Sequence, residues 1–110
     1  MKIAIDAMGG DNGHEVNVEG ACLAIDEFPS LEKLYLVGDE NQITNSLKRL
    51  NRNNSKIEII HSSEVVEMNE SPAMAIRRKK NSSISIATDL VKDGTCEAIV
   101  SAGNTGAAVA

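Results

Sequence analysis

Aromatic residues are nearly absent from this sequence. Phe28 and Tyr35 are the only two in 110 residues, and there is no tryptophan. A surface that stacks nucleobases needs several aromatic side chains. The formal charge of -5 also disfavours a nucleic-acid partner, because such binders are usually basic. We therefore expect no nucleic-acid partner, and a core built from Ile, Leu, Val, Ala and Met.

Long apolar runs and paired cysteines are also missing. No stretch approaches the about 18 uninterrupted apolar residues of a membrane-spanning helix, and the opening residues do not resemble a secretory signal. Cys22 and Cys96 lie far apart with no Cys-x-x-Cys pair, which argues against structural zinc and thioredoxin-like chemistry. We expect both cysteines to be small buried hydrophobic residues in a reducing cytoplasm, and we expect no metal or cofactor.

Apolar periodicity predicts alternating strands and helices. In the first expected helix the apolar residues fall on one face: Val18, Ala21, Cys22, Ile25 and Phe28. The spacing predicts strands over 2–6, 34–37, 57–61 and 98–101, and helices over 15–28, 43–50, 72–78 and 84–93, with a loop over 62–70. This order indicates an α/β fold with a mainly parallel sheet and right-handed crossovers.

The chain shows no repeat and no internal linker, so we expect residues 1–110 to form part of a single domain. Its last six residues read as the opening of a buried helix. About one and a half turns are too few to hold a helix by themselves. The sequence therefore predicts that this chain is a piece of a larger protein, or a truncated product.

Three segments carry candidate chemistry: 6–11, 77–83 and 101–106. The first and third follow a predicted strand and precede a helix, where glycines and free helix amides can hold an anion. Segment 101–106 fits a phosphate cradle, with Asn104 and Thr105 adding donors. A tight turn without a ligand is the alternative. Because no Gly-x-Gly-x-x-Gly and no Gly-Lys-Ser/Thr occurs, neither the dinucleotide nor the Walker pattern is present.

The other polar residues of these segments have structural alternatives. The basic run 77–80 is the only cluster of four cations, and it reads either as a solvated helix end or as a contact for phosphate or an acidic protein. The serines at 82–83 read first as helix caps. Asp6 and Asp11 are weak candidates for metal ligands, and we expect them to end a strand and cap a helix. His61, at a strand end, is expected to be structural.

Taken together, three stretches resemble the bacterial phosphate acyltransferases of phospholipid synthesis (acyl-ACP:phosphate acyltransferases). They are Ile-Asp-Ala-Met-Gly-Gly-Asp at 5–11, Ser-Pro-Ala-Met-Ala-Ile-Arg-Arg-Lys-Lys-Asn-Ser-Ser at 71–83 and Val-Ser-Ala-Gly-Asn-Thr-Gly-Ala at 100–107. The resemblance covers the whole chain. It implies a three-layer α/β/α fold of the isocitrate/isopropylmalate dehydrogenase type. Family members are longer, so the chain would be their N-terminal portion. His14 departs from the family pattern, which usually has proline there.

The resemblance also implies an activity. A fatty acyl group would pass from acyl carrier protein to inorganic phosphate, giving acyl-phosphate without a cofactor. The enzyme would be a cytoplasmic homodimer that visits the membrane surface, with a membrane-bound glycerol-3-phosphate acyltransferase as a further partner. Two alternatives are a non-catalytic phosphate-binding or dimerisation fragment of that enzyme, and a nicotinamide dehydrogenase on a related fold, against which the missing dinucleotide fingerprint counts.

Carried onto this sequence, the resemblance implies that Lys80 and Asn104 are catalytic. Phosphate is itself a nucleophile, so the protein must supply charge neutralisation and alignment rather than a nucleophilic side chain. The implied substrate-binding residues belong to the same three segments: Asp6, Gly9, Gly10, Asp11, Lys79, Ser82, Gly103, Thr105 and Gly106.

Overall fold

Strands and helices alternate along the chain in a computed structural model, which describes residues 1–8, 13–52, 55–63 and 81–101. The four predicted strands and three of the predicted helices are confirmed. The expected helix over 72–78 and most of the expected loop over 62–70 lie outside the described residues. The elements are β1 (Lys2–Asp6), α1 (Gly13–Glu27), β2 (Lys33–Gly38), α2 (Glu40–Arg49), β3 (Ile57–His61), α4 (Ser83–Lys92) and β4 (Ala98–Ser101).

The four strands form one sheet in the order β3-β2-β1-β4, and every neighbouring pair is parallel. The chain moves from β1 through β2 to β3 and then returns to place β4 on the other edge of β1. Because of this return, the direction of winding reverses at β1. Asp6, the last residue of β1, lies in register with Val37 of β2 on one side and Ser101 of β4 on the other.

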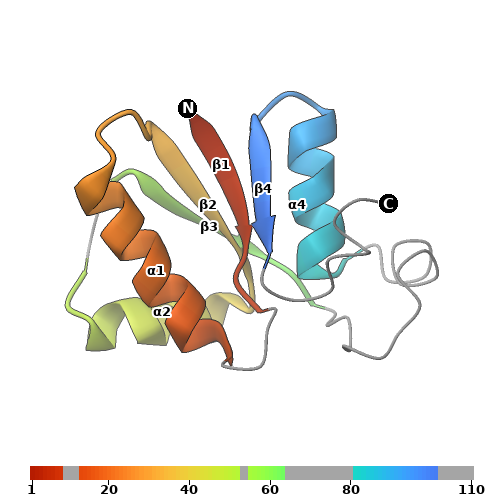
Figure 1. Cartoon of the computed structure of the whole chain (residues 1–110). Helices are drawn as coiled ribbons and strands as arrows, with labels where there is room; N and C mark the ends of the chain where they lie inside the picture. Colours follow the sequence, from red (N-terminus) through yellow and green to blue (C-terminus); the bar gives the residue numbers. More distant parts are fainter. Residues whose placement is uncertain (9–12, 53–54, 64–80, 102–110) are drawn as a thin grey trace.

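Helices cover both faces of the sheet: α1 and α2 lie on one face and α4 on the other (Figure 1). The alternation of side chains along β2 explains the division. Leu34 and Leu36 join the buried cluster on the side of α1 and α2. Tyr35 and Val37 join a second cluster with Ala87 of α4. The predicted three-layer α/β/α arrangement is therefore confirmed for the described residues.

One expectation about the core is wrong. Phe28 was expected on the buried face of α1, but it is 53% exposed. The helix ends at Glu27, and a turn in which the Leu31 amide donates to the Phe28 carbonyl (3.0 Å) follows. After this turn, Leu31 rather than Phe28 belongs to the buried core cluster. None of the helices in the described ranges is both long and apolar enough to cross a lipid bilayer.

Side chains at the strand ends fix where the helices begin. The Asp39 carboxylate accepts the amide of Gln42 (3.0 Å), and Nδ1 of His61 accepts the amide of Glu40 (3.1 Å), so both satisfy free donors of α2. His61 thus has the structural role expected of it. Helix α1 begins at Gly13 and includes His14, without the helix-starting proline of the family pattern. Past the end of α4, Gly94 has φ 85°, the left-handed conformation that glycine commonly adopts after a helix.

Gly38, at the end of β2, packs closely against Met8. A Cβ atom at Gly38 would lie 2.6 Å from Cγ and 2.7 Å from Sδ of Met8, and 3.1 Å from Cδ1 of Ile43. We therefore expect Gly38→Ala to lower the free energy of unfolding by about 1–3 kcal/mol, as overpacking does. Gly20, on an exposed part of α1, has no atom within 4 Å of its added Cβ. Gly20→Ala should raise the free energy of unfolding by about 0.5–1 kcal/mol. Urea unfolding of both variants checks this, and equal stabilities would contradict it.

Cys22 and Cys96 are free, and each is 3% exposed, as the sequence predicted. Burial raises the pKa of the Cys96 thiol, and the nearby Asp93 charge adds to the effect. Because thiol reagents attack the thiolate, we expect iodoacetamide at pH 8 to label Cys96 more than about tenfold more slowly in the folded protein than in urea. Mass spectrometry of the Cys96 peptide over time measures both rates. Equal rates would show that the thiol is accessible and ionised in the folded protein.

Candidate functional site

The carboxyl ends of β1 and β4 lie side by side at the point where the winding of the sheet reverses. In open parallel sheets, ligands bind in the crevice outside the strand carboxyl ends at such a point. Asp6 and Ser101, the last residues of these two strands, are partners in the register. The fold therefore places the candidate site here, at the ends of two of the segments singled out in the sequence.

Asp6 is a carboxylate with almost no contact with solvent, being 5% exposed. Its Oδ1 accepts the hydroxyl of Ser83 and the amide of Met8 (3.2 Å). Its Oδ2 accepts the hydroxyl of Ser101 (3.0 Å). A buried carboxylate is costly unless donors surround it, and these three supply that compensation. Asp6 also ends β1, as predicted.

The first turn of α4 is the second component of the site. Ser82 is fully buried and caps the helix, because its Oγ accepts the amide of Ser85 (3.3 Å). The predicted cap is therefore confirmed. Ser83 follows and donates its hydroxyl to Asp6. Within the described ranges, Oγ of Ser85 is the buried side-chain polar atom without a hydrogen-bond partner.

Backbone and side-chain hydrogen bonds hold the loops around the site. Nδ2 of Asn17 donates to the carbonyl of Ala7 (2.8 Å), which ties α1 to the residues just after β1. The Ser62 amide donates to the carbonyl of Gly38 (2.8 Å), and the Ser63 amide donates to the carbonyl of Asn81 (3.1 Å). The residues that flank 64–80 are thus joined to each other and to the end of β2.

The structure brings together one described residue from each of the three segments: Asp6 from the first, Ser83 from the second and Ser101 from the third. Of the predicted site residues, Asp6 and Ser82 are described, on β1 and at the start of α4. The others lie outside the described residues: Gly9, Gly10, Asp11, Lys79, Lys80, Gly103, Asn104, Thr105 and Gly106. Sequence reasoning did not identify Ser83 and Ser101 as partners of Asp6, because that contact depends on the strand order.

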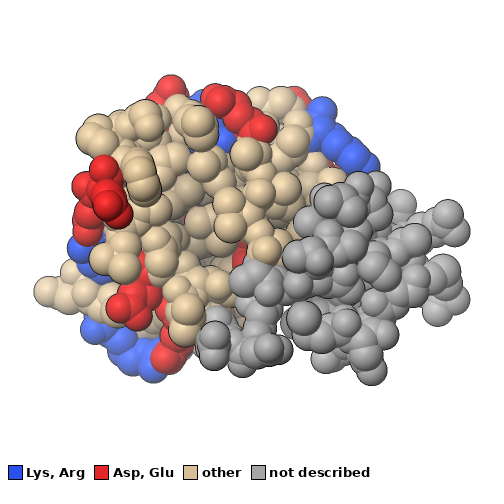
Figure 2. Space-filling model, in the orientation of Figure 1, with Lys and Arg blue, Asp and Glu red and all other residues tan. Residues whose placement is uncertain are grey.

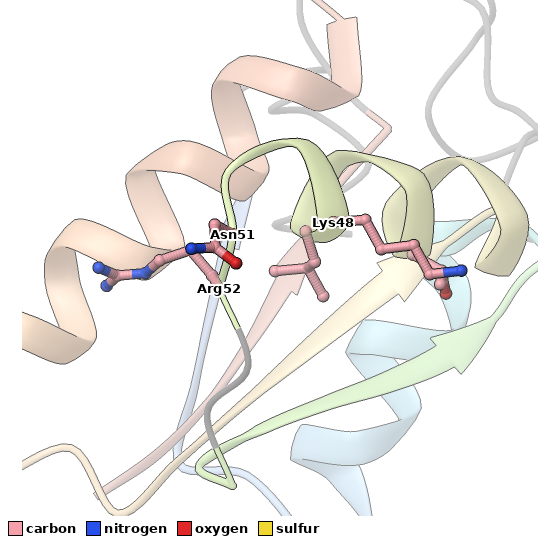
Figure 3. A pocket seen from close by; sticks show the side chains of 5 residues that line it. Lys48, Asn51 and Arg52 are labelled. Carbon is pink, nitrogen blue, oxygen red and sulfur yellow. The ribbon is translucent and has the colours of Figure 1, made fainter.

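A surface hollow of about 390 Å³ lies elsewhere, beside the C-terminal end of α2. Its lining includes two cations, Lys48 and Arg52, but Figure 3 shows their side chains pointing in opposite directions. Arg52 donates to the carbonyl of Cys22 (2.9 Å) and pairs with Asp26. The hydrogen bond that Arg52 donates to the Asp26 carboxylate raises the pKa of Arg52. Because α2 begins at the strand carboxyl ends and runs away from them, this hollow is distant from the candidate site.

Charge is mixed on the surface in view. Figure 2 shows acidic and basic side chains interspersed around the rim of one face, with uncharged residues at its centre. The described ion pairs on the surface include Arg49 with Glu15 and Lys33 with Glu58. Such exposed pairs contribute little to stability. Among the charged residues that the structure describes, Asp6 differs from these because its side chain is buried.

Known proteins are similar to this chain over its whole length, which includes the three segments that meet at this site. The model of a family described as "Fatty acid synthesis protein" matches residues 1–110. The chain is 56% identical over 110 residues to a phosphate acyltransferase of Akkermansia muciniphila, covering 100% of this chain and 32% of that protein. It is 54% identical to the phosphate acyltransferase of Pelotomaculum thermopropionicum and 46% identical to that of Clostridioides difficile, each over the whole chain and over 31% and 32% of those proteins.

The chain matches only part of each of these relatives. The chain spans about a third of the length of the curated relatives it matches, and it corresponds to their N-terminal part. The family model nevertheless covers the chain from its first residue to its last. The chain therefore belongs to the fatty acid synthesis protein family, with relatives named phosphate acyltransferase.

Proposed function

We propose that this chain is the N-terminal part of a single-domain enzyme that transfers a fatty acyl group from acyl carrier protein to inorganic phosphate. The observation that carries the proposal is the contact of Asp6 with Ser83 and Ser101, because it joins all three segments at the reversal point of the sheet. Relatives named phosphate acyltransferase support the same chemistry.

The reaction needs alignment more than a protein nucleophile. A phosphate oxygen attacks the thioester carbonyl carbon, forming a C–O bond. The C–S bond then breaks, and the sulfur leaves with the electron pair and takes up a proton, giving acyl-phosphate and the free carrier thiol. Both substrates carry negative charge, so a site for this reaction must neutralise phosphate and hold it close to the carbonyl.

The proposed roles follow the three segments. Around the end of β4, Gly103, Asn104, Thr105 and Gly106 would bind phosphate or the thioester oxygen, with Asn104 acting in catalysis. Before α4, Lys79, Lys80 and Ser82 would neutralise and position the phosphate, with Lys80 acting in catalysis. At the end of β1 and in the segment that follows it, Asp6, Gly9, Gly10 and Asp11 would form the neighbouring wall. No cofactor enters this scheme.

The proposal extends to partners. Acyl carrier protein is the acyl donor, and the enzyme works as a homodimer in the cytoplasm that visits the membrane surface and passes its product to a membrane-bound glycerol-3-phosphate acyltransferase. A second candidate function is a non-catalytic phosphate-binding or dimerisation fragment. It applies to these 110 residues taken alone.

The proposal predicts that the full gene product carrying residues 1–110 incorporates radiolabelled phosphate into a lipid-extractable acyl-phosphate when given palmitoyl-acyl carrier protein. Free carrier thiol should appear in equal amount. Asn104→Ala should lower kcat by about 100-fold or more, the cost of losing one donor to a developing oxyanion. Lys80→Ala should also lower turnover, because it removes a cation that neutralises phosphate.

Lys48→Ala is the matched control for Lys80→Ala. It removes an exposed lysine beside the hollow at the far end of α2 and should leave turnover unchanged. Unchanged turnover in Asn104→Ala or Lys80→Ala would remove that residue from the site. A gene product that makes no acyl-phosphate, but binds phosphate or dimerises, would favour the fragment function instead.

A further inference from the structure

The Asp6 carboxylate touches both of the elements that lead into the proposed phosphate site. Ser83, on its Oδ1, stands three positions after Lys80 in the sequence. Ser101, on its Oδ2, stands two positions before Gly103. These contacts span 77 and 95 positions of the chain, so one side chain joins segments that covalent structure leaves independent.

The direction of these hydrogen bonds limits what Asp6 can do. A carboxylate only accepts, so each serine hydroxyl gives its single proton to Asp6. Both carboxylate oxygens are engaged by donors of the protein itself, and the residue is 5% exposed. A carboxylate turned toward phosphate would repel it, whereas this one is turned inward and covered.

We propose that Asp6 is a positioning residue: its buried carboxylate fixes the spacing between the start of α4 and the end of β4, the two elements nearest in the sequence to the lysine pair and to the glycine-rich segment. This inference rests on the proposed acyl transfer to phosphate. Within the wall of the proposed site, Asp6 acts through Ser83 and Ser101 rather than as the substrate ligand that the resemblance implied. Misplacement of reacting groups by about 1 Å is enough to cost about 100-fold in rate, so the loss of this link is expected to affect kcat.

Asp39 provides a matched control. It directly follows β2 at the carboxyl edge of the sheet, and its carboxylate accepts a helix amide, that of Gln42 (3.0 Å). This hydrogen bond joins Asp39 to the first turn of α2, the helix that it caps, and not to α4 or β4. Asp39→Ala should therefore lower stability while leaving kcat unchanged, which separates a loss of stability from a loss of positioning.

The experiment compares kcat and the KM for phosphate in the full gene product. We expect Asp6→Ala to lower kcat by about 100-fold with a much smaller change in KM. The double variant Ser83→Ala/Ser101→Ala should show a similar fall in kcat. Adding Asp6→Ala to that double variant should lower kcat no further, because the carboxylate then has no hydroxyl left to hold.

Asp6→Asn keeps the test valid if Asp6→Ala does not fold. Its oxygen can still accept from Ser83 and Met8, and its amide can donate to the Ser101 oxygen. We expect it to fold and to recover most of the kcat that Asp6→Ala loses. Such recovery would show that the link matters more than the charge.

Three outcomes would overturn the inference: wild-type kcat in the double serine variant, losses of kcat that multiply when Asp6→Ala is added to it, or a change confined to the KM for phosphate. Each of these requires a wild-type protein that makes acyl-phosphate. A wild-type gene product that makes none would instead overturn the proposed function, and this inference with it.

Discussion

Strand β1 is hydrogen-bonded to a parallel neighbour along both edges, to β2 on one side and to β4 on the other. This pairing places the first strand of the chain in the middle of the sheet and makes it the point at which the winding reverses. The division of the helices between the two faces follows from the reversal, because each right-handed crossover sends its helix to the face set by the direction of travel. The candidate site follows as well, since the reversal leaves the ends of β1 and β4 adjacent.

The sequence was sufficient to predict what depends on local physical chemistry. Alternation and helical spacing predicted every described strand and helix, and the pattern of capping residues predicted the cap at Ser82. The prediction that Phe28 is buried was wrong, because helical spacing does not indicate the residue at which a helix ends. The turn that follows the helix places Leu31 in the core instead. The strand order, and with it the contact between Asp6 and Ser101, could not be predicted, because it depends on pairing between segments distant in the sequence.

The candidate site was predicted as three separate segments, and family resemblance supplied their roles. Local pattern could identify glycines, cations and helix starts, but it could not show that the segments meet. In the structure, the contact between the segments is made by Ser83 and Ser101, which donate to Asp6. The sequence pattern had indicated only a helix cap for Ser83 and a strand end for Ser101. Most of the residues that the resemblance assigns to substrate lie outside the described part of the chain.

The distance along the chain between Asp6 and its partners also affects how the protein folds during synthesis. Asp6 is synthesised before its two partners, because Ser83 and Ser101 follow it 77 and 95 positions later in the sequence. A carboxylate without its donors stays hydrated, since losing water before they arrive is costly. The edge of β1 that later receives β4 must therefore remain open and wet while β2 and β3 assemble. Arrival of β4 then pairs this edge of β1 and removes water from Asp6, the buried aspartate among the described residues.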